Sequence, residues 1–198
     1  ASGFSGELSL GHTATNHATP FTVPLSGTGV SGFHWAPVVA DAFVLKDLPT
    51  TNYGSDTNVW VGKRSEVAGL LRFDLGAIPN TATIETALLR LYVTNLREAE
   101  TGLACRASAF WLERGNSGVT WSTKPDRQGT CVNMISPLGE GYWLEVDVTA
   151  VVISWISDGQ PNFGFHLEGY GERALQYTFA SREWTDSSKV PQLYVQYR

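Results

Sequence analysis

The feature that most constrains the fold is a two-residue alternation of apolar and polar side chains, which recurs in short runs along most of the chain. Successive side chains of a β-strand point to opposite faces, so each run predicts a half-buried strand. Turns rich in glycine and proline separate the runs. The predicted strands cover residues 41–48, 58–62, 70–75, 86–93, 107–112, 119–122, 143–149, 163–169, 177–181 and 192–197.

One segment of this body departs from the alternation. The apolar stretch TAVVISWI, residues 149–156, favours a short α-helix, with Thr149 as its cap and Asp158-Gly159 at its end. About nine or ten strands with one short helix predict an all-β fold, a jelly-roll β-sandwich over residues 33–198. Its core is expected to include Leu71, Phe73, Leu75, Leu89, Leu91 and Val93.

Residues 1–32 predict a separate N-terminal β-hairpin arm. Pro24 cannot donate a hydrogen bond to a strand ladder, so the second strand is expected at an edge. Two isolated strands are marginally stable in water, and this hairpin must therefore dock on another surface. Its expected contact residues are Phe4, Leu8, Leu10, Phe21, Val23 and Leu25. The surface is either this chain's own sandwich or another copy of the chain.

Charge restricts the partners. The net charge is −5 with no basic stripe, which argues against nucleic acid. No apolar run reaches the roughly 18 residues of a membrane helix, so membrane insertion is not expected. Charged residues are only 17% of the chain and lysine is scarce, a balance typical of secreted, extracellular or cell-surface proteins. A first residue Ala1 in place of methionine suits a processed or excised product.

Two cysteines, Cys105 and Cys131, do not have the spacing of a zinc site. In a secreted protein they predict one disulfide; two buried thiols are the alternative. A disulfide that closes the loop between these two cysteines would stabilise the fold by roughly 3.5 kcal/mol in the chain-entropy model.

No motif for a catalytic nucleophile or a phosphate-binding loop is present, so no catalytic residue is expected. Four carboxylates on predicted strands leave three interpretations open. They are solvated or paired with arginine, they bind calcium, or they form the acid and base of a glycosidase. These residues are Asp74, Glu145, Asp147 and Glu168, and Glu145 and Asp147 are expected on one face of their strand. His166 is expected to be a structural residue.

Aromatic residues near turns are the other candidate site. Exposed aromatic rings can stack on sugars, although most rings in such a chain fill the core or its rim. Basic side chains near the rings could pair with uronate carboxylates. The candidate carbohydrate-binding residues are Trp121, Lys124, Trp143, Tyr170, Arg173 and Trp184, with Arg127 and Arg182 as further basic neighbours.

An ordered series of segments runs along the body: DAFVLKD, TNYGSDTNVWVG, LLRFDLGAIPNTATIETALLRLYV, VTWSTKP, WLEVDVTAVVISW, FGFHLEG, FASRE and PQLYVQY. Residues 41–198 thereby resemble the DNRLRE-type domain, which is related to alginate-binding carbohydrate-binding modules and to disaggregatase-associated domains. The resemblance implies a jelly-roll module of large secreted or cell-surface proteins, without catalysis. It implies an architectural role for Arg72, Asp74, Trp121, Arg182 and Glu183. The cysteine pair departs from its general pattern.

The arm has a different resemblance. Its segment FSGELSLGHTATNHATPFTVPLSGTGV is similar to the last two strands of a choice-of-anchor, hydin-type Ig-like domain, whose earlier strands are missing here. An orphan hairpin of this kind predicts strand addition to a neighbouring subunit and head-to-tail assembly, plausibly into a filament. A structural, adhesive subunit is therefore the first functional hypothesis. The alternatives are a module that binds an acidic polysaccharide such as alginate, an enzyme, and a domain of a longer adhesin with the hairpin folded back.

Overall fold

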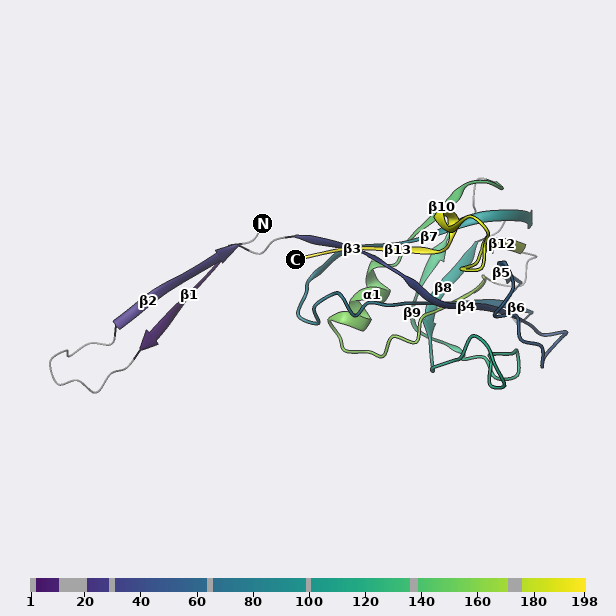
Figure 1. The fold of residues 1–198 in the computed structure, drawn as a ribbon, viewed down its shortest axis with the longest axis horizontal. Coiled ribbons are helices and arrows are strands. Elements are labelled where there is room, and N and C mark those ends of the chain that lie inside the picture. Colours follow the sequence, from purple (N-terminus) through teal and green to yellow (C-terminus); the bar gives the residue numbers. More distant parts are fainter. Residues whose placement is uncertain are drawn as a thin grey trace.

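The computed structural model of the chain describes residues 3–10, 21–28, 31–63, 66–98, 101–135, 139–170 and 176–198, the first two segments as backbone strands only. Among the described residues from 31 onward, it contains eleven strands in two antiparallel sheets, one α-helix and a short 3-10 helix, η1 (Ser187–Lys189). The predicted all-β sandwich is confirmed, and consecutive strands cross repeatedly between the two sheets (Figure 1).

The larger sheet has six strands. Its order is β3-β13-β7-β12-β5, and β10 pairs with β7 at one side of this path. Their bounds are β3 (Gly32–Ala36), β5 (Asn58–Gly62), β7 (Ile84–Glu98), β10 (Trp143–Asp147), β12 (Gln176–Ala180) and β13 (Gln192–Tyr197). The smaller sheet has the order β4-β6-β11-β8-β9. Its strands are β4 (Val38–Leu45), β6 (Val67–Phe73), β8 (Gly102–Ala107), β9 (Arg127–Met134) and β11 (Phe165–Gly169).

The core lies between the sheets, where every second side chain of each strand points inward. The predicted inward residues are all buried: Leu71, Phe73, Leu75, Leu89, Leu91 and Val93. The helix α1 (Thr149–Ile156) adds Val151, Val152 and Trp155 to this core. Burying apolar surface at about 25 cal/mol per Å² makes this layer the main source of stability.

A second, smaller cluster lies on the outer face of the five-stranded sheet. Trp111 and Val119, from the loop after β8, pack there over a group of mostly small side chains. The buried group comprises Ala40, Ala42, Val44, Ala68, Leu70 and Ala107. Because the loop covers this face, both faces of β4 and β6 are buried.

This loop corrects two strand predictions. Apart from Ala107, which ends β8, residues 107–112 and 119–122 do not form strands. They belong to a loop, and their apolar side chains alternate because the loop packs on a sheet face. The structure instead forms strands in β3, β8 and β9, which the pattern did not identify. Much of β9 is exposed, as is common for a strand at the edge of a sheet. Its sequence therefore lacks a clear alternation of apolar and polar residues.

The helix is confirmed at residues 149–156, but its predicted cap is wrong. Val148 occupies the N-cap position and makes no side-chain capping bond. Thr149 instead uses its hydroxyl to accept a hydrogen bond from Ala87 N at 2.9 Å and to donate one to Asp147 Oδ1 at 2.6 Å. Beyond the helix, Gly159 has a φ of 65°, which favours glycine and ends the element.

Cys105 and Cys131 form the predicted disulfide and lie directly opposite each other on β8 and β9. Cys105 is fully buried. The bond therefore ties the exposed edge strand β9 to the interior of the smaller sheet.

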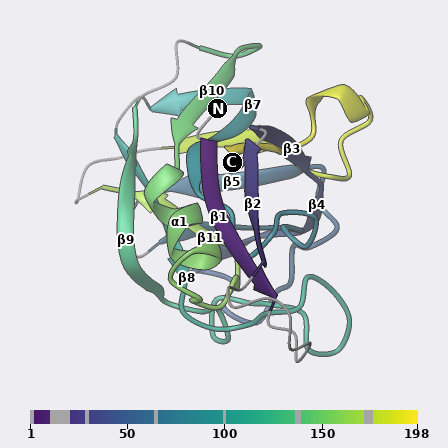
Figure 2. The same ribbon diagram turned by 90° about the vertical axis from the view of Figure 1, so that its left-hand side faces the viewer.

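The strands β1 (Gly3–Leu10) and β2 (Phe21–Thr28) form the predicted hairpin. Within the described part of the chain they pair with each other and with no other strand. Figure 1 shows them beyond one end of the sandwich, the end that faces the viewer in Figure 2. The side chains proposed for assembly lie outside the described residues: Phe4, Leu8, Leu10, Phe21, Val23 and Leu25. A membrane-spanning helix, long and apolar throughout, does not occur among the residues that the structure describes.

Candidate functional site

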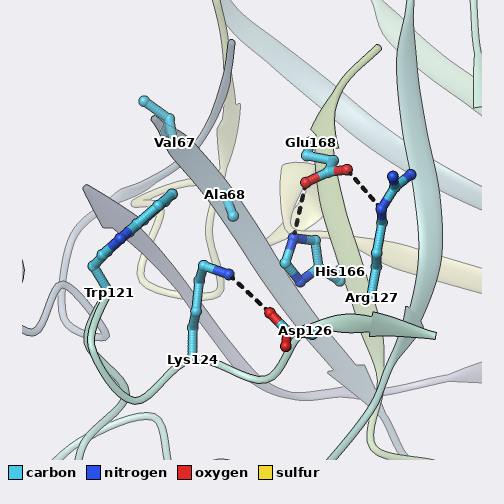
Figure 3. A pocket seen from close by; sticks show the side chains of 8 residues that line it. All are labelled: Val67, Ala68, Trp121, Lys124, Asp126, Arg127, His166 and Glu168. Atoms are coloured by element: carbon cyan, nitrogen blue, oxygen red, sulfur yellow. Dashed lines mark ion pairs between the residues drawn. The ribbon is translucent and has the colours of Figure 1, made fainter. Parts of the chain in front are cut away.

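A groove of about 330 Å³ opens on the outer face of the five-stranded sheet, beside the loop that carries Trp121 (Figure 3). Its floor comes from β6 and β11, and its walls come from the loop and the start of β9. The residues that line it are Val67, Ala68, Trp121, Lys124, Asp126, Arg127, His166 and Glu168. We refer to this site as the basic groove.

Trp121 and Lys124 stand together on one wall of the basic groove. The turn that carries them is fixed by a hydrogen bond from Thr123 N to Thr120 O at 3.1 Å. Lys124 Nζ lies 4.9 Å from the centre of the Trp121 ring and 3.5 Å from Asp126 Oδ1. The Asp126 side chain is 89% exposed, so this ion pair contributes little and can exchange for another carboxylate.

A buried chain of polar groups fixes the other wall. His166 Nδ1 lies 3.1 Å from Pro125 O, and because a carbonyl only accepts, Nδ1 carries the hydrogen. His166 Nε2 lies 3.4 Å from Glu168 Oε2, and Arg127 Nε lies 3.1 Å from Glu168 Oε1. His166 and Glu168 are buried, whereas the Arg127 side chain is 33% exposed. This series of polar groups thus holds the cationic side chain of Arg127 at the rim of the groove.

The sequence predicted only part of this site. Trp121 and Lys124 do lie together, and Arg127 joins them. His166 and Glu168 were not assigned to a sugar site, although the FHLEG alternation places both on the face opposite Phe165 and Leu167. That alternation was the sequence signal that could have placed His166 and Glu168 on the outer face of the sheet.

The other proposed sugar-binding residues lie elsewhere. Trp143 is on β10 in the other sheet, and Tyr170 is 62% exposed just after β11. Trp184 lines a separate polar hollow with Asn58 and Thr94. Arg173 lies outside the described residues. The six candidates therefore do not form one site.

The four carboxylates considered for calcium or catalysis have separate partners. Asp74 Oδ1 accepts from Gly76 N, and Asp147 Oδ1 accepts from Thr149 N. Glu145 Oε1 pairs with Arg90 Nε at 2.8 Å, and Glu168 pairs with Arg127. Hydrogen bonds from the Thr149 hydroxyl and N–H lower the pKa of Asp147. Glu145 and Glu168 match the arginine-paired interpretation, whereas Asp74 and Asp147 accept hydrogen bonds from nearby backbone N–H groups.

A different acidic group has the spacing of a cation site. One carboxylate oxygen from each of Asp41, Glu113 and Glu183 lies within 4.8 Å of the others. Two arginines occupy the surroundings: Arg182 Nη1 lies 3.1 Å from Glu113 Oε2, and Arg114 pairs with Glu183. The arrangement is an ion-pair network, as predicted for Arg182 and Glu183.

The electrostatics of this network centre on Asp41. Burial raises the pKa of Asp41 to about 8, against the lowering effect of a hydrogen bond from Arg182 N. The charges of Glu183 and Glu113 raise it further. The Asp41 carboxyl is therefore protonated at neutral pH in this network.

Arg72 has the predicted architectural role. Its guanidinium carbon lies 4.6 Å from the centre of the Phe110 ring, and Nη1 donates to Trp111 O at 3.1 Å. Trp111 Nε1 in turn donates to Phe163 O at 2.9 Å. These contacts hold the loop that forms one side of the basic groove.

Similar proteins include the tRNA nuclease WapA of Bacillus subtilis (strain 168) and the tRNA3(Ser)-specific nuclease WapA of Bacillus spizizenii. Each is 30% identical over 182 residues, which is 81% of this chain and 7% of the relative. The chain thus spans about 7% of the length of these relatives, and their nuclease activity belongs to much longer proteins.

The family model for carbohydrate-binding module family 96 matches residues 35–197, nearly the whole sandwich. The narrower resemblances to the DNRLRE-type domain and to a hydin-type Ig-like domain stay predictions. The match begins within β3 and ends at the last residue of β13, so it covers both sheets and the basic groove. The chain belongs to carbohydrate-binding module family 96.

Proposed function

We propose that this chain is a non-catalytic, extracellular module that binds an acidic polysaccharide such as alginate in the basic groove. The observation that carries the proposal is the pairing of the Trp121 ring with Lys124 and Arg127 around one hollow of a carbohydrate-binding module. An aromatic ring can stack on a sugar face while cations pair with its carboxylate.

The groove can accept a carboxylate although its lysine already has a partner. Asp126 is almost fully exposed and returns to water at little cost, so a uronate can replace it beside Lys124. Arg127 cannot lose Glu168 as easily, because an unpaired buried carboxylate is costly. Arg127 is therefore expected to bind the ligand with its exposed edge while Glu168 holds its Nε.

Calorimetry with alginate oligosaccharides tests this function. Trp121→Ala and Lys124→Ala should each weaken binding about tenfold, the effect of losing one stacking or charged contact. Lys46→Ala, at an exposed lysine after β4, is the matched control and should bind as the wild type does. Absence of binding at millimolar alginate, or equal affinity in all variants, would exclude the groove as the site.

The hairpin supports a second proposed function, assembly with other copies of the chain into a head-to-tail, adhesive filament. The observation behind it is that β1 and β2 form a sheet of their own, whose strands are free of other partners in the described part of the chain. A two-stranded sheet gains stability when it adds to a larger one. Mass measurement by light scattering over a wide concentration range, with negative-stain microscopy, tests it; a monomer throughout would contradict assembly.

A further inference from the structure

The outer face of the six-stranded sheet carries a continuous row of aromatic rings, on the side of the sandwich opposite the basic groove. The row crosses β3, β13, β7 and β10, and we call it the aromatic platform. Its members are Phe33, Trp35, Tyr194, Arg90, Trp143 and Tyr92. Four adjacent strands span roughly 14 Å at the usual strand spacing, enough for several sugar rings.

Neighbouring members of the platform touch. The ring centres of Phe33 and Tyr194 lie 6.2 Å apart, and those of Tyr194 and Trp35 lie 5.1 Å apart. The Arg90 guanidinium bridges the row, with its carbon 5.8 Å from the Trp35 ring centre and 4.7 Å from that of Trp143. The contacts of Arg90 thus join the rings of β3 and β13 to those of β7 and β10.

Strand register fixes this row. Trp35 lies directly opposite Tyr194, and Trp143 lies opposite Tyr92. The next residue along each strand points into the core, for example Ala36 after Trp35 and Leu144 after Trp143. The side chains of the row must therefore point outward. Phe33 is 68% exposed and Trp35 48% exposed, although water is the less favourable environment for both rings.

Polar groups stand between the rings. Gln192 and Glu145 flank Arg90, since Arg90 Nη1 donates to Gln192 Oε1 at 2.9 Å and Arg90 Nε donates to Glu145 Oε1 at 2.8 Å. Lys189 Nζ lies 4.7 Å from the Tyr92 ring centre and 3.3 Å from Asp186 Oδ2. Arg90 in the platform and Lys189 beside it thus each have a neighbouring carboxylate.

A hollow of about 400 Å³ adjoins the row, a size typical of ligand sites. Trp35 and Arg90 belong to both the hollow and the platform, and Gln192 lines the hollow beside Arg90. The remaining wall is apolar, formed by Ala36, Pro37, Val38, Val190 and Pro191. A chain lying along the rings therefore meets a concave end and not only a flat surface.

We propose that the aromatic platform is a second carbohydrate-binding surface, and that it takes a neutral, β-1,4-linked polysaccharide. Equatorial linkages make such a chain a flat ribbon with C–H groups on both faces, which matches rings arrayed on a sheet. Trp35 and Trp143 stack on sugar rings, while Gln192, Glu145 and Arg90 bind hydroxyl groups.

Charge distinguishes the two surfaces. The basic groove combines one ring with two cations, and one of those cations has a partner that readily exchanges. The platform combines five rings with Arg90 and Lys189, whose partners Glu145 and Asp186 are 52% and 46% exposed, against 89% for Asp126, and therefore exchange less readily for a uronate. This second site does not depend on the proposed binding of an acidic polysaccharide.

A titration of the full chain with cellohexaose, followed by NMR, tests the inference without any substitution. The indole N–H signals of Trp35 and Trp143 should shift, and that of Trp121 should not. Maltohexaose, whose chain curves, is the control ligand and should cause little change. Unchanged platform signals at millimolar cellohexaose, or a shift centred on Trp121, would overturn the proposal.

Variants give the independent measurement. Trp35→Ala and Trp143→Ala should each weaken cellohexaose binding by about tenfold or more and leave alginate affinity unchanged. Trp121→Ala should do the reverse, so failure of the groove and failure of the platform are distinguishable. Thermal melting verifies that each variant is folded. If light scattering instead shows that the chain forms a dimer, and Phe33→Ser makes it a monomer with no effect on sugar binding, the platform is a self-association surface and the proposal is wrong.

Discussion

Asp41 illustrates how one buried carboxyl group couples stability to pH. Its pKa is 3.8 in the unfolded chain and about 8 in the folded one, so the folded state holds a proton that the unfolded state releases. The resulting stability is complete below about pH 4 and is lost as the pH rises through about 8. We expect the free energy of unfolding to fall by at most about 1.4 kcal/mol per pH unit in this range.

Asp41→Asn tests this coupling, because the amide resembles the protonated carboxyl and can still accept from Arg182 N. Urea unfolding at about pH 5 and about pH 8 should show a smaller difference between the two conditions in the variant than in the wild type. Asp158→Asn, an exposed carboxylate after the helix, is the control and should keep the wild-type difference. Equal differences in all three proteins would contradict the role of Asp41.

Asp126 provides a residue-scale test of the groove. Its carboxylate competes with a ligand for Lys124. Asp126→Asn should therefore raise the affinity for alginate by a factor of about two to five, within the energy of an exposed ion pair. Calorimetry measures the effect, and a fall in affinity would show that Asp126 itself contributes to binding.

At the scale of elements, Thr149 connects the helix α1 to the strand β7. Its hydroxyl accepts from the buried Ala87 N–H, and Thr149→Val would leave that donor unpaired. We expect a loss of about 1–3 kcal/mol in the free energy of unfolding. Thr149→Ser keeps the hydroxyl and should lose less than half of that amount. Similar losses in both variants would contradict a main role for the hydroxyl, because Thr149→Ser keeps that group.

The disulfide acts on the edge strand β9. Only Met134 of this strand is fully buried, so the strand depends on its covalent link to β8. Reduction should lower the free energy of unfolding by about 3.5 kcal/mol, the value for a loop of 26 residues. Urea unfolding with and without reductant measures it, and the double variant Cys105→Ser, Cys131→Ser should not respond to reductant. Since β9 begins at Arg127, reduction should also weaken alginate binding.

At the scale of the whole molecule, the two proposed surfaces lie on opposite outer faces of one sandwich. We expect them to act independently, because the rigid core separates them. Saturating cellohexaose should leave the alginate dissociation constant unchanged. High salt should weaken alginate binding and not cellohexaose binding, since only the first depends on charge. Competition between the two sugars would place both on one surface.

The sequence identified the elements whose signals are local. The alternation at residues 86–93 predicted a strand with the correct inward face, and that at residues 192–197 predicted another strand, because a period of two needs no knowledge of neighbours. The apolar helix was predicted for a similar reason, whereas the disulfide was predicted from the cysteine spacing and the expected secretion. The loop at residues 107–122 was misassigned because its apolar side chains bury themselves against a sheet face, which is a non-local contact.

The sequence by itself determined the fold class through side-chain period, and it supplied the aromatic and basic residue types from which the proposed sugar-binding surfaces are built. Tertiary structure alone decided which residues meet. Trp121, Arg127 and His166 share a groove because the loop crosses β6 and β11, and Trp35 reaches Trp143 through Arg90 because β3, β13, β7 and β10 are adjacent. Strand order and register arise from the packing of distant segments, and no local pattern in the chain specifies them.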